Sequence, residues 1–413
     1  MLFFAGASEL EAQNSAPAAS IMSVLAAAAA VLWTNATSLT VLNQHKWSNQ
    51  QLPNQQLPNP YARLPISAKD HVRPSVYGLS EMSAGVQIAF ATNASSISLR
   101  WQMTEAHCGE EATVPIALCA GPDLYVWDAL WEELGGWRWA GTATNISFVD
   151  GISGKSNDWQ LHMYTPPPPK PGWGATERAY LLNLPMYGKV LGLAIGVPAH
   201  ESTSLAPLTG SSKVGPPPPK VKPIVWYGTS ITQGAAASRP GMGATNIVSR
   251  VLNLEVLNFG FSGNGKLELN VSDYLSQIDA SALILDCLHN MDAALVANNT
   301  EPLVRAYRAK RPETPIIFAE GIPYGASWEG AASPSRQRQL DRRKEFKDAF
   351  MRLEADNVQH ISYLTGDQLL WNMPDGVPWQ PTEGGTHPSD LGMASMATAW
   401  IKYLPSVVHG LGR

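Results

Sequence analysis

The sequence has few cysteines, few charged residues and no excess of basic ones. Its only cysteines are Cys108, Cys119 and Cys287, which excludes a disulfide framework and leaves room for one loop closed by Cys108 and Cys119. Charged residues make up 15% of the chain and the formal net charge is -5, so we expect no nucleic-acid partner. We predict neither a metal nor a cofactor, because no Cys/His cluster has zinc spacing and no phosphate-binding loop occurs.

An apolar run near the N-terminus, Ile21–Trp33, is too short for a membrane span and has the length of a signal-peptide core. Small residues at Thr34–Ser38 offer a cleavage site, whereas the preceding segment carries Glu9 and Glu11 where a signal needs positive charge. We expect a secretory signal or a weak anchor, and the alternative is an Ala-rich buried or disordered tail.

Five Asn-x-Ser/Thr sequons fit a secreted chain, and they begin at Asn35, Asn93, Asn145, Asn270 and Asn298. Together with the signal-like run they predict a protein that is secreted or in the secretory pathway. A cytoplasmic location stays open.

The chain is too long for one ordinary domain, since it has 413 residues of which 45% are hydrophobic. Residues 1–40 are expected to be the signal-like or disordered segment. Residues 41–69 form a linker or strap, because Trp47–Arg63 is rich in Gln, Asn and Pro. A first domain then covers residues 70–215, and a second covers residues 221–413.

The first domain is predicted to be an antiparallel β-sandwich, similar to a jelly roll, because short alternating runs are broken by Gly, Asn, Asp and Pro. These runs are Val86–Ala91, Ile97–Gln102, Leu124–Trp127, Trp137–Ala140, Ser147–Val149, Trp159–Tyr164, Ala179–Leu184 and Val190–Ile195. Proline runs favour extended polyproline II, so Pro166–Pro169 indicates an inter-strand loop and Pro216–Pro219 the joint between the domains. The 14 tryptophans suit either a sandwich core or a sugar-binding surface.

The second domain alternates strands with helices, which is typical of an α/β fold with a doubly wound parallel sheet and helices on both faces. Strands are expected at Ile224–Tyr227, Val256–Asn258, Leu283–Leu285, Ile316–Ala319 and His360–Tyr363. Helices are expected near Ala244–Leu252, Asp273–Ile278, Glu301–Lys310, Arg336–Ala355 and Asp390–Leu404.

Candidate chemistry gathers at the carboxyl ends of these strands, where ligands bind in open α/β sheets. Val221–Gly234 (VKPIVWYGTSITQG) delivers Ser230 directly after the first strand. The Gly-rich segment Asn258–Gly265 follows the second strand, and Asn290 follows the third. His387 stands before the last helix. A nucleophile, a base and preorganised N–H donors are the groups that acyl transfer requires.

The segment Pro223–Leu404 resembles the SGNH, or GDSL-like, hydrolase family in the blocks Gly228-Thr-Ser-Ile-Thr-Gln-Gly234, Ser262-Gly-Asn264, Asn290 and Thr386-His-Pro388. The resemblance implies a three-layer α/β/α domain. It also implies that Ser230 is the nucleophile and His387 the base. The N–H groups of Ser230 and Gly263 and the side chain of Asn290 would form the oxyanion hole.

The first domain carries Gly121-Pro-Asp-Leu-Tyr125, which resembles a Gly-x-Asp-Leu-Tyr element that precedes some SGNH domains. That subgroup also has the blocks found here at Ile231–Gly234, Ala237–Gly241 and Phe261–Lys266. Some carbohydrate esterases likewise join a jelly roll to an SGNH domain, so the resemblance implies deacylation of a sugar ester.

One position departs from the family pattern, in which an Asp lies three residues before the histidine. Gly384 takes that position here and Glu383 precedes it. We expect Glu383 to orient His387, and the alternatives are Asp375 or a backbone carbonyl.

Three further residues, Arg239, Trp328 and Trp379, are candidates for substrate binding. The alternative for Arg239 is a structural salt bridge. The alternative for the two tryptophans is packing within their loops. His289 is expected to be a supporting group, and Cys287 an inert buried thiol.

We predict a serine esterase for short acyl groups, such as acetyl on a carbohydrate. The alternatives are a lipid or lysophospholipid acylhydrolase and a non-catalytic glycan-binding protein.

Overall fold

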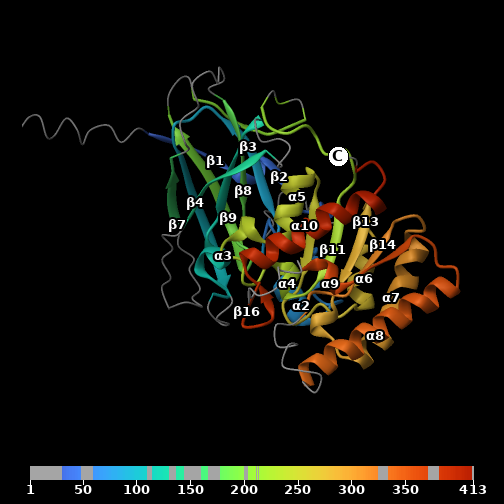
Figure 1. The fold of residues 1–413 in the computed structure, drawn as a ribbon. Helices are drawn as coiled ribbons and strands as arrows, with labels where there is room; N and C mark the ends of the chain where they lie inside the picture. Colours follow the sequence, from blue (N-terminus) through green and yellow to red (C-terminus); the bar gives the residue numbers. More distant parts are fainter. Residues whose placement is uncertain are drawn as a thin grey trace, which may run out of the picture.

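The protein is described by a computed structural model of two adjoining domains (Figure 1). The structure describes residues 30–47, 59–108, 114–129, 136–143, 160–165, 177–199, 203–210, 212, 214–323, 334–370 and 381–411. The predicted run Ser147–Val149, the loop Pro166–Pro169 and Asn145 lie outside these residues.

The first domain is an antiparallel β-sandwich, as predicted. One sheet has four strands in the order β1-β9-β4-β7, and the other has β10-β3-β8-β5-β6, with β2 also paired to β3. The strands are β1 (Val31–Asn35), β2 (Thr40–Leu42), β3 (Gln87–Thr92), β4 (Ile97–Ala106), β5 (Asp123–Trp127), β6 (Trp137–Thr142), β7 (Gln160–Tyr164), β8 (Arg178–Asn183), β9 (Gly188–Pro198) and β10 (Leu205–Pro207). Short helical segments are η1 (Ala36–Ser38) and α3 (Ile116–Ala120).

The core of the sandwich lies between the two sheets. Leu99 and Trp101 of one sheet and Phe90 and Leu182 of the other belong to the same buried cluster. A disulfide joins Cys108 to Cys119 at the edge of this core, with a Cα–Cα distance of 5.4 Å. It closes the loop that the cysteine spacing allows.

The start of the sandwich corrects two expectations about the N-terminal region. Val31–Trp33, the end of the signal-like run, lies in β1, which pairs with β9 from Val31 to Asn35. Thr34–Ser38, the predicted cleavage site, forms the end of β1 and η1, so cleavage there would remove an edge strand. Strand β2, Thr40–Leu42, spans the start of the predicted linker and pairs with β3. Strand formation therefore begins well before residue 70.

The second domain contains the predicted parallel sheet, in the order β12-β11-β13-β14-β15. Its strands are β11 (Ile224–Gly228), β12 (Val256–Gly260), β13 (Ala282–Asp286), β14 (Ile316–Ala319) and β15 (Ile361–Leu364). Its helical elements are α4 (Ser230–Gln233), η4 (Pro240–Met242), α5 (Ala244–Leu252), α6 (Leu269–Leu275), η5 (Leu288–Asn290), α7 (Ala293–Lys310), α8 (Pro334–Ala355), α9 (Gly366–Leu369) and α10 (Asp390–Val407). A two-stranded hairpin pairs β16 (Thr382–Glu383) with β17 (His387–Pro388).

Helices cover both faces of this sheet, which explains its continuous apolar strands. Alternate residues of β11 face opposite layers: Trp226 belongs to the buried cluster that includes α5 and α10, and Tyr227 to the one that includes α6, α7 and α8. The α5/α10 layer lies between the sheet and the sandwich (Figure 1) and shares one buried cluster with the sandwich core. The two domains therefore have a continuous hydrophobic core.

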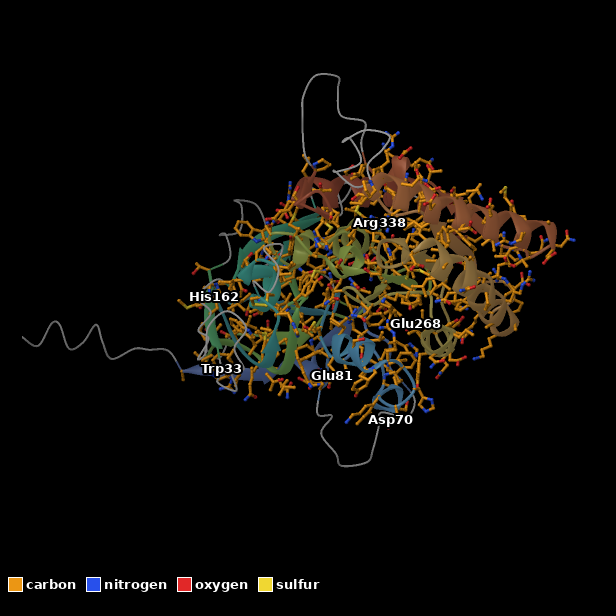
Figure 2. All side chains as sticks on the ribbon, turned by 90° about the horizontal axis from the view of Figure 1, so that it is seen from below. Trp33, Asp70, Glu81, His162, Glu268 and Arg338 are labelled. Atoms are coloured by element: carbon orange, nitrogen blue, oxygen red, sulfur yellow. A yellow bond between two sulfur atoms is a disulfide. The ribbon has the colours of Figure 1, made fainter. Side chains whose placement is uncertain are left out.

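A strap before the first long strand ties the domains together from a second side. It contains η2 (Ile66–Ala68) and α2 (Pro74–Ser80), and Figure 2 shows it at Asp70 and Glu81 along one face of the molecule. Its Arg63 is only 3% exposed and donates hydrogen bonds to four backbone carbonyls. Two of these carbonyls, those of Asn258 and Gly260, belong to β12, so Arg63 locks the strap to the parallel sheet.

Replacing Arg63 by Ala should lower the free energy of unfolding by about 3 kcal/mol or more, because several buried carbonyls would lose their donors. Urea denaturation measures the loss. Arg338→Ala is the control, since that side chain is exposed on α8 and should cost less than about 0.5 kcal/mol. Equal losses in the two variants would contradict this account of the strap.

Candidate active site

Ser230 lies where the central strand of the parallel sheet ends. β11 ends at Gly228, and Thr229 caps the short helix α4, whose first residue is Ser230. A Cβ on Gly228 would lie 1.9 Å from Thr232 Oγ1, so glycine is required for this sharp turn. The Ser230 side chain is thereby presented at the carboxyl edge of the sheet, and its residue is 8% exposed.

His387 reaches the serine from the hairpin that precedes α10. Its Nε2 lies 2.8 Å from Ser230 Oγ, which is hydrogen-bonding distance. Gly384 and Gly385 form the tip of the hairpin with φ of 58° and 76°, a backbone conformation that favours glycine. The two residues predicted to act as nucleophile and base are therefore in contact.

Glu383 lies directly opposite His387 in the β16–β17 pair. Residues opposite each other in an antiparallel pair project from the same face, with Cβ atoms about 5 Å apart. The Glu383 side chain is exposed to solvent. Asp375, the other predicted carboxylate, lies outside the described residues.

The predicted oxyanion-hole residues surround the same edge of the sheet. The Phe261 amide donates to the Gly228 carbonyl over 3.1 Å, and Asn290 Nδ2 donates to the Phe261 carbonyl over 3.2 Å. Asn290 is thus linked through Phe261 to the turn that carries Ser230. Gly263 is exposed with φ of 65°, and a Cβ there would meet nothing within 4 Å. Its backbone is open to a ligand.

Gln233 holds the Gly-rich turn in place, a contact that the motif alone did not predict. Its Oε1 accepts from the Ser262 amide over 3.0 Å, and its Nε2 donates to the Met186 carbonyl of the sandwich over 3.2 Å. This side chain is completely buried. One residue of α4 therefore connects the turn that carries Ser230, the Gly-rich turn and the first domain.

Two ionisable groups, the buried Asp286 and the partly buried His289, lie at the end of β13 and shortly after it. Asp286, at the end of β13, accepts from Trp226 Nε1 over 3.1 Å and from Thr232 Oγ1 over 3.0 Å. Burial raises the pKa of Asp286 to about 6. Burial lowers the pKa of His289 to about 3, so its imidazole is neutral, and its Nε2 lies 3.0 Å from the Ile322 carbonyl. A neutral ring directed at that carbonyl fits the supporting role predicted for His289.

The structure also describes two of the other residues singled out in the sequence, Arg239 and Cys287. The Arg239 guanidinium lies 3.4 Å from Asp123 and 3.9 Å from Asp390, which matches the salt-bridge alternative. Cys287 is buried without a disulfide, and burial raises the pKa of its thiol. Trp328 and Trp379 lie outside the described residues.

Among the residues that are described, no cluster of His, Cys, Asp or Glu could hold a metal. Within the same residues, no helix combines the length and apolarity needed to cross a membrane.

Comparison with known proteins agrees with this architecture. Residues 221–405 match the model of the GDSL-like lipase/acylhydrolase family, and residues 31–203 match that of the GxDLY N-terminus of SGNH-hydrolase-type esterases. These matches and the fold define a carboxylic ester hydrolase. The second domain therefore matches a GDSL-like lipase/acylhydrolase domain, and the first matches the GxDLY domain that precedes such hydrolases. No curated protein sequence matches the chain.

Solved structures share the whole two-domain arrangement. A Bacteroides ovatus protein described as a GDSL-like lipase is 28% identical with a TM-score of 0.72, over 92% of this chain and 97% of that one. A salicylyl-acyltransferase from a tetracycline biosynthetic pathway is 17% identical with a TM-score of 0.67, over 93% and 99%. A family two carbohydrate esterase from Cellvibrio japonicus is 13% identical with a TM-score of 0.52, over 93% and 100%. The last two show similarity of fold.

The pKa of Asp286 leads to a prediction about pH and stability. The raised pKa means that the folded protein takes up a proton as the pH falls through about 6, whereas the unfolded chain does so near 3.8. Lowering the pH from 7 to 5 should therefore stabilise the wild type by about 1 kcal/mol relative to Asp286→Asn, whose amide does not ionise. Urea unfolding of both proteins at the two pH values measures this difference. Parallel pH dependences would show that Asp286 is not the group responsible.

Proposed function

We propose that the protein is a serine esterase that hydrolyses a short acyl ester through an acyl-Ser230 intermediate. The observation that carries the proposal is the 2.8 Å contact between Ser230 Oγ and His387 Nε2 at the carboxyl edge of the parallel sheet. Gly263 and Asn290 lie at the same edge and offer N–H donors. Together these groups supply a nucleophile, a base and a site for a developing negative charge.

In the first half of the reaction, His387 Nε2 accepts the Ser230 proton as Oγ attacks the ester carbonyl carbon. The carbonyl oxygen becomes an oxyanion, and the N–H groups of Ser230 and Gly263 and Asn290 Nδ2 stabilise it. When the tetrahedral intermediate collapses, the bond to the alcohol breaks and His387 returns the proton to the departing alkoxide. The acyl group remains on Ser230.

In the second half, His387 deprotonates a water molecule that attacks the acyl-enzyme. The Ser230–acyl bond breaks, the carboxylic acid leaves, and His387 returns the proton to Ser230. Each half generates an imidazolium, which a nearby carboxylate stabilises and orients. We assign this role to Glu383, because it is the cross-strand partner of His387.

A carbohydrate acetyl ester is the substrate class that we favour. The shared fold with a family two carbohydrate esterase supports it by analogy. A lipid or lysophospholipid substrate is the competing class, and graded acyl-chain lengths separate the two. A purely glycan-binding role would have no use for the Ser230–His387 contact. We also propose that the protein is secreted, since a disulfide in the first domain suits an oxidising compartment.

Changing Ser230 to Ala should abolish hydrolysis of p-nitrophenyl esters and labelling by a fluorophosphonate. Wild-type activity should be highest for acetyl and propionyl esters and should extend to acetylated sugars. Ser406→Ala, which alters an exposed serine of α10, is the control and should retain full activity. Residual wild-type rates in Ser230→Ala would refute the mechanism, and a preference for long acyl chains would favour the lipid alternative.

Changing Glu383 to Gln should lower kcat about tenfold or more, because the imidazolium would lose its carboxylate partner. KM should change little, since Glu383 is not assigned to substrate binding. Glu354→Gln, at an exposed position on α8, controls for the loss of one negative charge. An unchanged kcat in Glu383→Gln would mean that another group orients His387.

A further inference from the structure

The Asp of the Gly-x-Asp-Leu-Tyr element joins the two domains. Asp123 lies at the start of β5 and its side chain is completely buried. Its Oδ1 accepts from Trp139 Nε1 over 2.9 Å and from Thr142 Oγ1 over 2.7 Å, both within the sandwich. Its Oδ2 accepts from the Gly241 amide over 3.0 Å and lies 3.4 Å from Arg239 Nε, both in the hydrolase domain. One carboxylate therefore has an oxygen bound in each domain.

The Tyr of the same element fits against the same turn. Tyr125 is 5% exposed, and the Arg250 guanidinium lies 4.2 Å from the centre of its ring. A Cβ on Gly241 would lie 2.4 Å from Tyr125 ring atoms and 2.5 Å from Asp123 Oδ2. Only glycine fits between these side chains, so the Gly-x-Asp-Leu-Tyr element and the Arg239–Gly241 turn are complementary surfaces.

A further set of contacts leads from the Arg239–Gly241 turn toward the segment that carries His387. Asp390, the first residue of α10, accepts from the Ser238 amide over 2.7 Å and from Ser238 Oγ over 2.6 Å, and it lies 3.9 Å from Arg239 Nη1. His387 is three residues before Asp390 in the chain. A continuous series of contacts thus leads from Asp123 through Arg239 and Ser238 to the segment that carries His387.

The sandwich also contacts the backbone behind the nucleophile. Tyr187 Oη donates to the Ser230 carbonyl over 3.4 Å, and the Met186 carbonyl accepts from Gln233. The first domain therefore contacts the serine turn directly, and it reaches the start of α10 through Arg239 and Ser238. Ser230 and His387 lie on separate elements, and each element is linked to the sandwich by one of these two routes.

We propose that the first domain positions the catalytic base, with Asp123, Arg239 and Asp390 as positioning residues for His387. This inference rests on the proposed function, in which His387 acts as base. The sandwich is accordingly part of the catalytic unit. Disturbing Asp123 should change the geometry of the His387 hairpin and leave substrate binding largely intact.

The test compares wild type, Asp123→Asn, Asp390→Asn and Glu81→Gln. Asp123→Asn keeps the shape of the side chain and removes its charge and one acceptor. Asp390→Asn makes the same change at a side chain that is 36% exposed, whereas Asp123 is fully buried. Glu81→Gln is the matched control, because it breaks a 2.8 Å ion pair with Lys189 that does not lead to the base. Each protein is assayed with p-nitrophenyl acetate, and amide hydrogen exchange of residues 382–393 is followed by mass spectrometry.

We expect kcat to fall about tenfold in both Asp variants with KM within twofold of wild type, and exchange of residues 382–393 to accelerate. Glu81→Gln should match wild type in both measurements. Asp variants that lose thermal stability but keep wild-type kcat and wild-type exchange in this segment would overturn the inference. A wild-type protein that hydrolyses no ester would refute the proposed function instead, and the exchange comparison would still decide whether Asp123 positions the hairpin.

Discussion

The hydrogen bond between Ser230 and His387 is the interaction that the rest of the structure has to maintain. It joins residues 157 positions apart in the sequence, and neither lies in the regular part of a long element. Ser230 begins a helix of four residues, and His387 lies in a two-residue strand. Elements this short have little stability of their own, so the contact depends on groups packed around both ends.

The two ends are supported to very different degrees. Around Ser230, Gln233 and Asp286 are buried and hydrogen-bonded, and Gly228 brings neighbouring backbones into close contact. Around His387, the hairpin tip is formed by two glycines, and Glu383 is exposed. Glycines and exposed side chains leave more conformational freedom to be lost on ordering. His387 is therefore the less constrained partner of the hydrogen bond.

The sequence predicted the regular elements of the second domain well. α5 (Ala244–Leu252) and β14 (Ile316–Ala319) begin and end at the expected residues, because strong periodicity and flanking turn residues define them. β1 and β2 were not predicted, since their residues form strands only by pairing with β9 and β3 across most of the domain. Local pattern cannot supply that information.

The candidate site likewise contains features that local sequence predicts and features that depend on long-range packing. Ser230 and His387 belong to recognisable blocks, whereas the contact of Gln233 with the Ser262 amide depends on how two turns pack together. The Gly-x-Asp-Leu-Tyr element was visible in the sequence, but its chemistry was not. A buried carboxylate is costly unless it is paired and hydrogen-bonded, and two of the four groups that contact the Asp123 carboxylate, the Gly241 amide and the Arg239 guanidinium, belong to the other domain. A buried aspartate on the side of the sandwich that meets the hydrolase domain is therefore explained only once both domains are present. A domain that brought only a separate binding surface would have no need to share a fully buried charge with the turn that leads, through Asp390, to the segment carrying His387.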